Sequence, residues 1–206
     1  MPLQNRVDPF GTIHANPARG LFMGNRGGKI HDPATKMLLR RRFASKRWII
    51  CVCAYRNWHR EVMGQGYTEL FFLDEVTALS AGHRPCAFCR RADFNRYCTA
   101  VAPDAAERVR IDAVDLKLHA QRLRPKPRLE DSRMPGGWPD GTMAALGDMA
   151  FAKRGAKALP WNFTGYGDPR PWHEIAKAGA ALLTPQTSVM ALQNGYRPLW
   201  HPSAGA

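Results

Sequence analysis

Residues 67–90 read YTELFFLDEVTALSAGHRPCAFCR, and this stretch carries the clearest structural signals in the chain. The aromatic and β-branched side chains at its start favour a strand over residues 67–72. Asp74 then stands where a helix N-cap belongs, and Gly82 stands in the C′ position that ends many helices in a left-handed conformation. We therefore expect a strand, a short helix and a tight turn over residues 85–89, in that order.

Patterns on either side of this stretch predict further elements. Hydrophobic periodicity and turn signals are the basis for each of them. In chain order they are loops and short strands over 1–35, a helix over 34–44, a buried strand over 48–55, a return strand from Asn57 through Met63, a helix over 90–101, a helix from Asp104 to Leu123 opened by a capping box with Glu107, a β-hairpin over 142–153, a strand over 180–183, and a helix from Thr184 to Gly195.

The chain is strongly basic, and the excess charge is unevenly distributed. Its 206 residues contain thirty Lys and Arg against seventeen Asp and Glu, a formal charge of +13, and 45% of them are hydrophobic, which is enough for a core. Residues 1–56 hold eleven basic residues against only Asp8 and Asp32, whereas residues 57–206 hold nineteen against fifteen acidic ones. Such a field attracts polyanions, nucleic acid first and anionic membrane surfaces second.

Membrane and secretory proteins do not fit this composition. No apolar run approaches the roughly 20 residues of a membrane span, and the start lacks a basic region followed by an apolar stretch. A cytoplasmic protein with no membrane partner is expected, with nucleic acid, and DNA in particular, as its partner. The basic residues expected to contact phosphates are Arg26, Lys29, Arg40, Arg41, Arg42, Lys46, Arg47, Arg84 and Arg90.

Four of the five cysteines form two close pairs, Cys51-x-Cys53 and Cys86-x-x-Cys89. The C-x-x-C spacing lets both thiolates reach one ion, and cysteines in the cytoplasm are normally reduced. We expect Zn²⁺ bound by all four. The alternative for the upstream pair is that it packs in the core, as free cysteines often do. If only one of that pair binds the metal, a histidine would complete the site, with the candidates His31, His59 and His83.

The same region resembles the Ada-like zinc-binding domain, the N-terminal module of bacterial methylphosphotriester-repair and adaptive-response proteins. The resemblance covers about residues 48–92, under a quarter of the chain. The matching positions are Phe71-Phe72, Glu75, Ala78 and the run AGHRPCAFCR at residues 81–90. It implies a small α/β module in which four cysteine thiolates bind zinc and which contacts the DNA backbone.

Under this resemblance, Cys86 and Cys89 match the downstream ligand pair of the family. Cys51 and Cys53 would be the upstream pair, with Cys51 in the place of the cysteine that accepts the methyl group. The family has three residues between its upstream cysteines and this chain has one. The zinc knuckle therefore carries over better than the acceptor role, and the resemblance implies DNA binding in repair or processing.

Two enzymatic interpretations stay open beside it. Polar side chains among the N-terminal glycines could handle a phosphate, because backbone N–H groups can approach it closely. Together with Glu69, the pair His31 and Asp32 would then serve a metal-dependent nuclease. The pattern H-x-E at His59–Glu61, followed by P-C-x-x-C, is the signature of zinc-dependent nucleobase deaminases, in which the glutamate transfers the proton.

The sequence as a whole predicts an α+β fold. Residues 1–125 would hold the basic loops, the zinc-stabilised Ada-like α/β module and a helix. Residues 126–140, rich in Pro and Gly, would form a linker, and residues 141–206 a smaller α/β part packed on the first.

Overall fold

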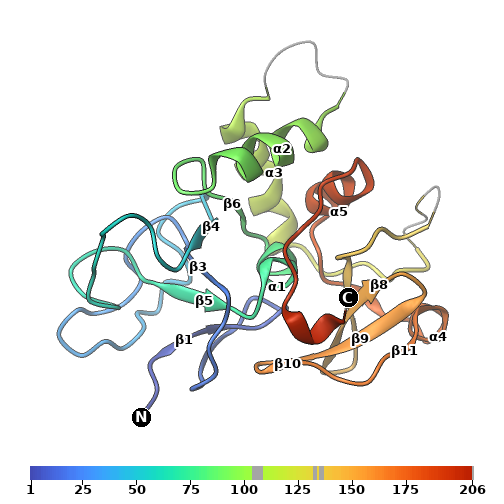
Figure 1. Cartoon of the computed structure of the whole chain (residues 1–206), viewed down its shortest axis with the longest axis horizontal. Coiled ribbons are helices and arrows are strands. Elements are labelled where there is room, and N and C mark those ends of the chain that lie inside the picture. The colour runs from blue at the N-terminus through green and yellow to red at the C-terminus, as the bar shows by residue number, and fades with distance from the viewer. Residues whose placement is uncertain (104–108, 132–133, 135–136, 206) are drawn as a thin grey trace.

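The structure is a computed structural model that describes residues 1–103, 109–131, 134 and 137–205. These residues form two β-sheets and several helices in an α+β arrangement, which confirms the predicted fold class (Figure 1). Within the described ranges, no helix has the length and apolar character needed to cross a membrane.

The first sheet is mixed and belongs to the N-terminal part. Its strands lie in the order β2-β1-β5-β3-β4-β6. The pairs β1–β5 and β4–β6 are parallel and the other neighbouring pairs are antiparallel. The strands are β1 (Gln4–Val7), β2 (Ile13–Ala15), β3 (Phe22–Asn25), β4 (Ile49–Val52), β5 (Leu70–Phe72) and β6 (Arg84–Pro85).

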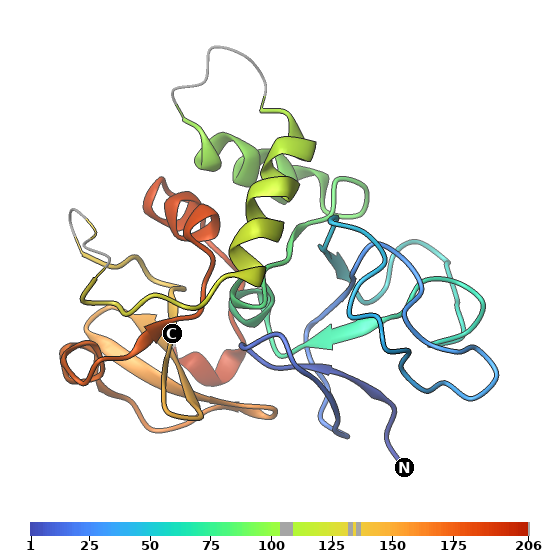
Figure 2. The same ribbon diagram turned by 180° about the vertical axis from the view of Figure 1, so that it is seen from behind.

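Helix α1 (Glu75–Ser80) lies at the centre of the molecule, between the two sheets (Figures 1 and 2). It begins as predicted, because the Asp74 carboxylate accepts a hydrogen bond from the N–H of Thr77 at 2.8 Å. It also ends as predicted, before Gly82 with φ of +83°. Every residue of α1 is buried, and the helix contributes side chains to the hydrophobic clusters on both sides of it.

Three helices lie in the upper part of Figure 1, and α5 (Gln186–Gln193) packs against both α2 (Arg91–Val101) and α3 (Ile111–Leu123). The α2 helix was predicted over nearly the same residues. The predicted capping box of the next helix lies outside the described residues, and the described helix begins at Ile111. Tyr97 joins α2 to α5, because its hydroxyl lies 3.0 Å from Ser188 Oγ and both side chains are buried.

The second sheet is antiparallel and belongs to the C-terminal part, in the order β10-β9-β8-β7-β12, with β11 paired to β9. The predicted hairpin around Gly147 is confirmed by β7 and β8. The sequence did not indicate β9, β10, β11 or α4. The elements are β7 (Met143–Leu146), β8 (Met149–Arg154), β9 (Lys157–Asn162), β10 (Gly165–Tyr166), β11 (Arg170–Pro171), α4 (Trp172–Lys177), β12 (Ala181–Leu182) and the 3-10 turn Pro202–Ala204.

The C-terminal part is held to the N-terminal part by buried polar groups at the start of α1. The Tyr166 hydroxyl donates to Asp74 at 2.8 Å, and the N–H of His201 donates to the same carboxylate at 3.1 Å. Glu75 accepts the Tyr196 hydroxyl and the N–H of Leu199. Two acidic side chains therefore fasten the returning chain to the central helix.

Two predicted elements are wrong. The segment 34–44 contains no helix, because its backbone pairs with an earlier loop: Leu39 N–H donates to Ile30 O and Ala44 N–H to Arg26 O, each at 2.9 Å. The segment 57–63 contains turns in place of a return strand. Its last residue, Met63, has a positive φ of 54°, which an extended strand does not allow.

The C-terminal helix begins one residue later than predicted, because Thr184 was expected as its N-cap and Pro185 as its first helical residue. Pro185 occupies the N-cap position of α5, and Thr184 uses its hydroxyl elsewhere. The Thr184 Oγ1 atom accepts a hydrogen bond from the N–H of Met143 at 2.8 Å, so it ties the helix to β7.

Candidate metal centre

Three cysteines from two distant parts of the chain converge at the edge of the first sheet. The sulfur atoms of Cys51, Cys86 and Cys89 all lie within 4.8 Å of one another. Three thiolates around a tetrahedral zinc ion, with Zn–S bonds of about 2.3 Å, would be about 3.8 Å apart. The cluster could hold a metal ion after small side-chain adjustments. Among the described residues, no other group of three or more His, Cys, Asp or Glu side chains is arranged in this way.

Strand pairing brings the cysteines together. The β-branched residues of β4 favour an extended strand, which pairs in parallel with β6 so that Ile50 lies opposite Pro85. The N–H of Cys86 then donates to Ile50 O at 2.9 Å, directly after the strand. This bond fixes Cys86 beside Cys51, although 34 positions separate them in the sequence.

The turn over residues 86–89, which we call the knuckle, directs backbone N–H groups at its own sulfur atoms. Phe88 donates its N–H to Cys86 Sγ at 3.3 Å, and Cys89 also donates its N–H to this sulfur. The N–H of Val52 donates to the sulfur of Cys89. Such N–H···S bonds stabilise thiolates that bind a metal and hold them in one orientation.

The three thiols share hydrogen bonds among themselves. The pKa of Cys86 is lowered mainly because the Cys51 and Cys89 thiols donate hydrogen bonds to its sulfur. The pKa of Cys51 is raised because its thiol is the donor in such a bond and because it is buried. The cluster therefore already stabilises one thiolate, which is the form of cysteine that binds a metal.

Cys53, the fourth expected ligand, does not join the cluster. Strand β4 ends at Val52, so the alternation that would turn Cys53 to the same face as Cys51 is lost at that point. Cys53 is exposed, and its sulfur contacts Leu21 O at 3.5 Å. None of the three histidines considered as alternatives joins the cluster either.

The expected methyl-acceptor position is also buried. Cys51 is only 7% exposed, whereas an acceptor sulfur must be reached by its substrate as an activated thiolate. The acceptor role of Cys51 therefore has no support from this geometry.

Two arginines that we expected to contact nucleic acid are buried in ion pairs. Arg84 binds both oxygens of Asp115, at 3.0 and 2.8 Å. Arg90 binds both oxygens of Glu75, each at 2.9 Å, and also contacts Asp93. Their charges are neutralised inside the protein, so we remove Arg84 and Arg90 from the expected interface. Their role is to hold the two ends of the knuckle.

The nuclease candidates His31 and Glu69 are fixed by structural hydrogen bonds. His31 is buried, with Nδ1 2.6 Å from the Thr68 hydroxyl and Nε2 2.8 Å from Gly64 O. Glu69 is also buried and accepts the N–H of Met63 at 2.8 Å. Both ring nitrogens of His31 are therefore already engaged in hydrogen bonds within the fold.

The other two catalytic candidates form local surface contacts. Asp32 accepts the N–H groups of Ala34 and Thr35, which lower its pKa and close a turn. Glu61, the proton carrier of the deaminase interpretation, is exposed and paired with Lys36 at 2.7 Å. In the structure as described, neither belongs to a metal-binding group.

The remaining basic residues differ in their surroundings. Most of them lie in the segment 40–47, which we call the basic strap. Its side chains Arg40, Arg41, Arg42 and Lys46 are exposed and have no carboxylate partner among the described residues. Arg47 is paired with Asp112 at 2.9 Å. Outside the strap, Lys29 is half-buried and forms no ion pair within the described ranges, and Arg26 is buried.

The structure also reveals an aromatic cluster that the sequence analysis missed. Phe88, inside the knuckle, lies in a stacked arrangement with Trp58, with 5.8 Å between ring centroids. Tyr55 contacts both rings. Phe88 is 54% and Trp58 60% exposed, so flat aromatic surface stands in water beside the cysteines. The aromatic residue between the two cysteines was the available signal.

Comparison of the chain with protein-family models, with curated proteins and with solved structures finds no match.

Proposed function

We propose that this protein binds one zinc ion through Cys51, Cys86 and Cys89 and binds nucleic acid, with DNA expected, beside the metal-supported knuckle. The observation that carries the proposal is the convergence of three sulfur atoms on a turn whose N–H groups point at them. Repair or processing of DNA is the setting that the resemblance of residues 48–92 implies.

Zinc is the metal that best suits this donor set. Thiolates are soft ligands that favour zinc among the divalent ions common in proteins. The ion would cross-link β4 to the knuckle and thereby to the start of α2. Because its binding energy becomes folding energy, removing it should loosen these elements. With three protein ligands, a fourth coordination position would be left for water or a ligand.

The nucleic-acid partner is supported by charge and by aromatic surface. The unpaired cations of the basic strap would neutralise phosphates and release counterions. The exposed rings of Trp58 and Phe88 would stack on bases, which need to be unpaired for this contact. We therefore expect single-stranded DNA to bind more tightly than a duplex of the same length.

Metal analysis tests the first half of the proposal. Purified protein should contain about one zinc per chain. The Cys86→Ser variant should lose it, whereas Cys53→Ser, the matched control outside the cluster, should keep it. Zinc-free protein, or equal zinc in both variants, would refute the assignment.

Salt-dependent binding tests the second half. Affinity for a single-stranded oligonucleotide should fall steeply as the salt concentration rises. Each phosphate contact contributes about 0.7 to the steepness of the plot of log K against log[salt], so the triple variant R40A/R41A/R42A should make this plot shallower by about 2. The control K157A/R170A/K177A removes the same charge from exposed positions of the C-terminal part. Equal slopes for the two triple variants would contradict an interface at the strap.

The nuclease and deaminase interpretations lack comparable support. The two nitrogens of His31 are engaged in structural hydrogen bonds, and Glu61 is paired on the surface with Lys36. Neither residue shares a metal-binding group with the cysteines, so the proposed function is binding.

A further inference from the structure

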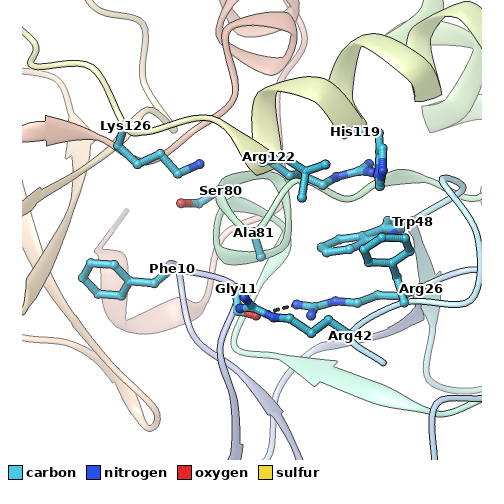
Figure 3. A pocket seen from close by; sticks show the side chains of 12 residues that line it. Phe10, Gly11, Arg26, Arg42, Trp48, Ser80, Ala81, His119, Arg122 and Lys126 are labelled. Atoms are coloured by element: carbon cyan, nitrogen blue, oxygen red, sulfur yellow. Dashed lines mark hydrogen bonds between the residues drawn. The ribbon is translucent and has the colours of Figure 1, made fainter. Parts of the chain in front are cut away.

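A cavity of about 80 Å³ lies beside the C-terminal end of α3 and is built around Trp48. The guanidinium carbons of Arg26 and Arg122 stand 4.1 and 4.3 Å from ring centroids of this indole. Figure 3 shows Trp48 between these two arginines, with Phe10 and Lys126 on the other side of the cavity. Two cations are thus held against one aromatic side chain.

In the part of the chain that the structure describes, neither guanidinium group has a carboxylate partner. Arg26 is 1% exposed; its Nη2 donates to Gly11 O at 2.6 Å, while its Nε has no partner. Arg122 donates to Gly82 O at 2.9 Å and Lys46 O at 3.1 Å, and its buried Nη2 has no partner. Carbonyl oxygens satisfy part of the hydrogen bonding but carry no full negative charge.

The rest of this protein pairs its buried arginines differently. Arg84 and Arg90 each bind both oxygens of a buried carboxylate, as buried charges normally require. Arg26 and the half-buried Arg122 instead lie at the cavity without such a carboxylate among the described residues, so an external anion could supply the missing negative charge.

Two further cations, Arg42 and Lys126, add to the positive field at the cavity, which His119 also lines. None of its described lining residues is acidic. His119 Nδ1 is buried without a partner. Burial, together with neighbouring arginines, lowers the pKa of Arg26. The lowered pKa means that the charged form of this side chain is unfavourable as long as no anion lies beside it.

The carboxylates that favour the charged forms of Arg26 and Arg122 are bound to other side chains. Asp8, which acts on Arg26, bonds His14 at 2.8 Å. Asp115, which acts on Arg122, is the bidentate partner of Arg84. Both lie outside the residues that line the cavity.

We infer that this cavity binds the phosphate group of a phosphomonoester. Guanidinium groups match phosphate oxygens in geometry, and a phosphate dianion balances two cations. The cavity of about 80 Å³ has room for one tetrahedral group. Because Arg26 is so deeply buried, the group must enter with a free end, so an internal phosphodiester does not fit.

The first experiment measures phosphate binding without any nucleic acid. Thermal unfolding and titration calorimetry would use inorganic phosphate and phenyl phosphate, with chloride at equal ionic strength and benzoate as controls. Phosphate and phenyl phosphate should raise the unfolding temperature in a saturable way. No saturable effect, or an equal effect of benzoate, would overturn the inference.

Variants locate the site. Arg122→Met should weaken phenyl phosphate binding by about tenfold to a hundredfold, the loss expected for a charge-assisted hydrogen-bonding group. Arg124→Met is the matched control, two residues further on and outside the cavity. Should Arg122→Met not fold, Arg42→Met, which changes an exposed residue at the same cavity, should also weaken binding. Unchanged affinity in the folded cavity variants would overturn the inference.

A last comparison identifies the source of the phosphate. The ligand is the end of a strand if an oligonucleotide with a 5′-phosphate binds more tightly than its 5′-hydroxyl counterpart and Arg122→Met abolishes this difference. The ligand is a small phosphomonoester if the two oligonucleotides bind equally well while phenyl phosphate still binds. The phosphate assays contain no nucleic acid, so a failure of the proposed function and a failure of this cavity give different results.

Discussion

Glu75 connects the knuckle, the central helix and the C-terminal chain through one buried carboxylate. It accepts two hydrogen bonds from Arg90, one from the Tyr196 hydroxyl and one from the N–H of Leu199. The substitution Glu75→Gln keeps the shape of the side chain and removes its charge. It also turns one acceptor atom into a donor that faces Arg90.

The magnitude of this change follows from burial. Arg90 and Glu75 are both nearly inaccessible to water, and removing one partner of such a pair costs about 3–5 kcal/mol because the other charge stays buried. Asp93 retains its contact with Arg90, which favours the lower half of that range. With a urea m value of about 2 kcal/mol/M, the unfolding midpoint should fall by about 1.5–2 M.

Urea unfolding followed by circular dichroism would measure this change. Glu174→Gln is the matched control, because Glu174 forms an exposed pair with Arg170 at 3.7 Å and should contribute under about 1 kcal/mol. Glu75→Gln should also release zinc to a chelator faster than Glu174→Gln, since Arg90 follows Cys89 directly. Equal midpoints for the two variants would refute the structural role assigned to Glu75.

Three further changes test other parts of the structure. Burial and nearby arginines lower the pKa of His83 well below 6.5, so this histidine takes up a proton on unfolding at acidic pH. As the pH falls from 8 to 5, His83 should therefore lower the free energy of unfolding by about 2 kcal/mol. In urea unfolding at several pH values, the His83→Phe variant should not show this loss. In Gly24→Ala the new Cβ would stand 2.2 Å from Ile49 O, and this clash should lower the free energy of unfolding by about 2 kcal/mol or more. The control Gly167→Ala, whose new Cβ has no neighbour closer than 3.9 Å, should be nearly neutral. Equal urea midpoints for the two variants would contradict this expectation. Chelation of the metal should lower the thermal midpoint by about 10 °C for a site filled at a thousand times its Kd, and Cys51→Ser should be insensitive to chelator in the same calorimetric scan.

Much of the centre of the molecule could be predicted because its signals are local. Asp74 and Gly82 mark the two ends of α1 through hydrogen bonding and left-handed backbone geometry, which depend on a few neighbouring residues. The C-x-x-C spacing likewise identifies a turn that can present two sulfurs. These features needed no knowledge of the remaining chain.

Other features depend on long-range pairing and were beyond a local pattern. Cys51 reaches the knuckle only because β4 and β6 pair in parallel, and Cys53 misses it because β4 stops at Val52. The segment 34–44 has helix-forming residues, but its backbone N–H groups bond to an earlier loop. The cavity around Trp48 collects side chains from parts of the chain too distant for any spacing rule.

X-ray absorption at the zinc edge of the purified protein tests the central claim most directly. Coordination by Cys51, Cys86 and Cys89 predicts three sulfur atoms at about 2.3 Å and one lighter atom, with the sulfur shell lost in Cys86→Ser. Zinc surrounded only by nitrogen and oxygen, or a sulfur shell that survives this substitution unchanged, would contradict the claim.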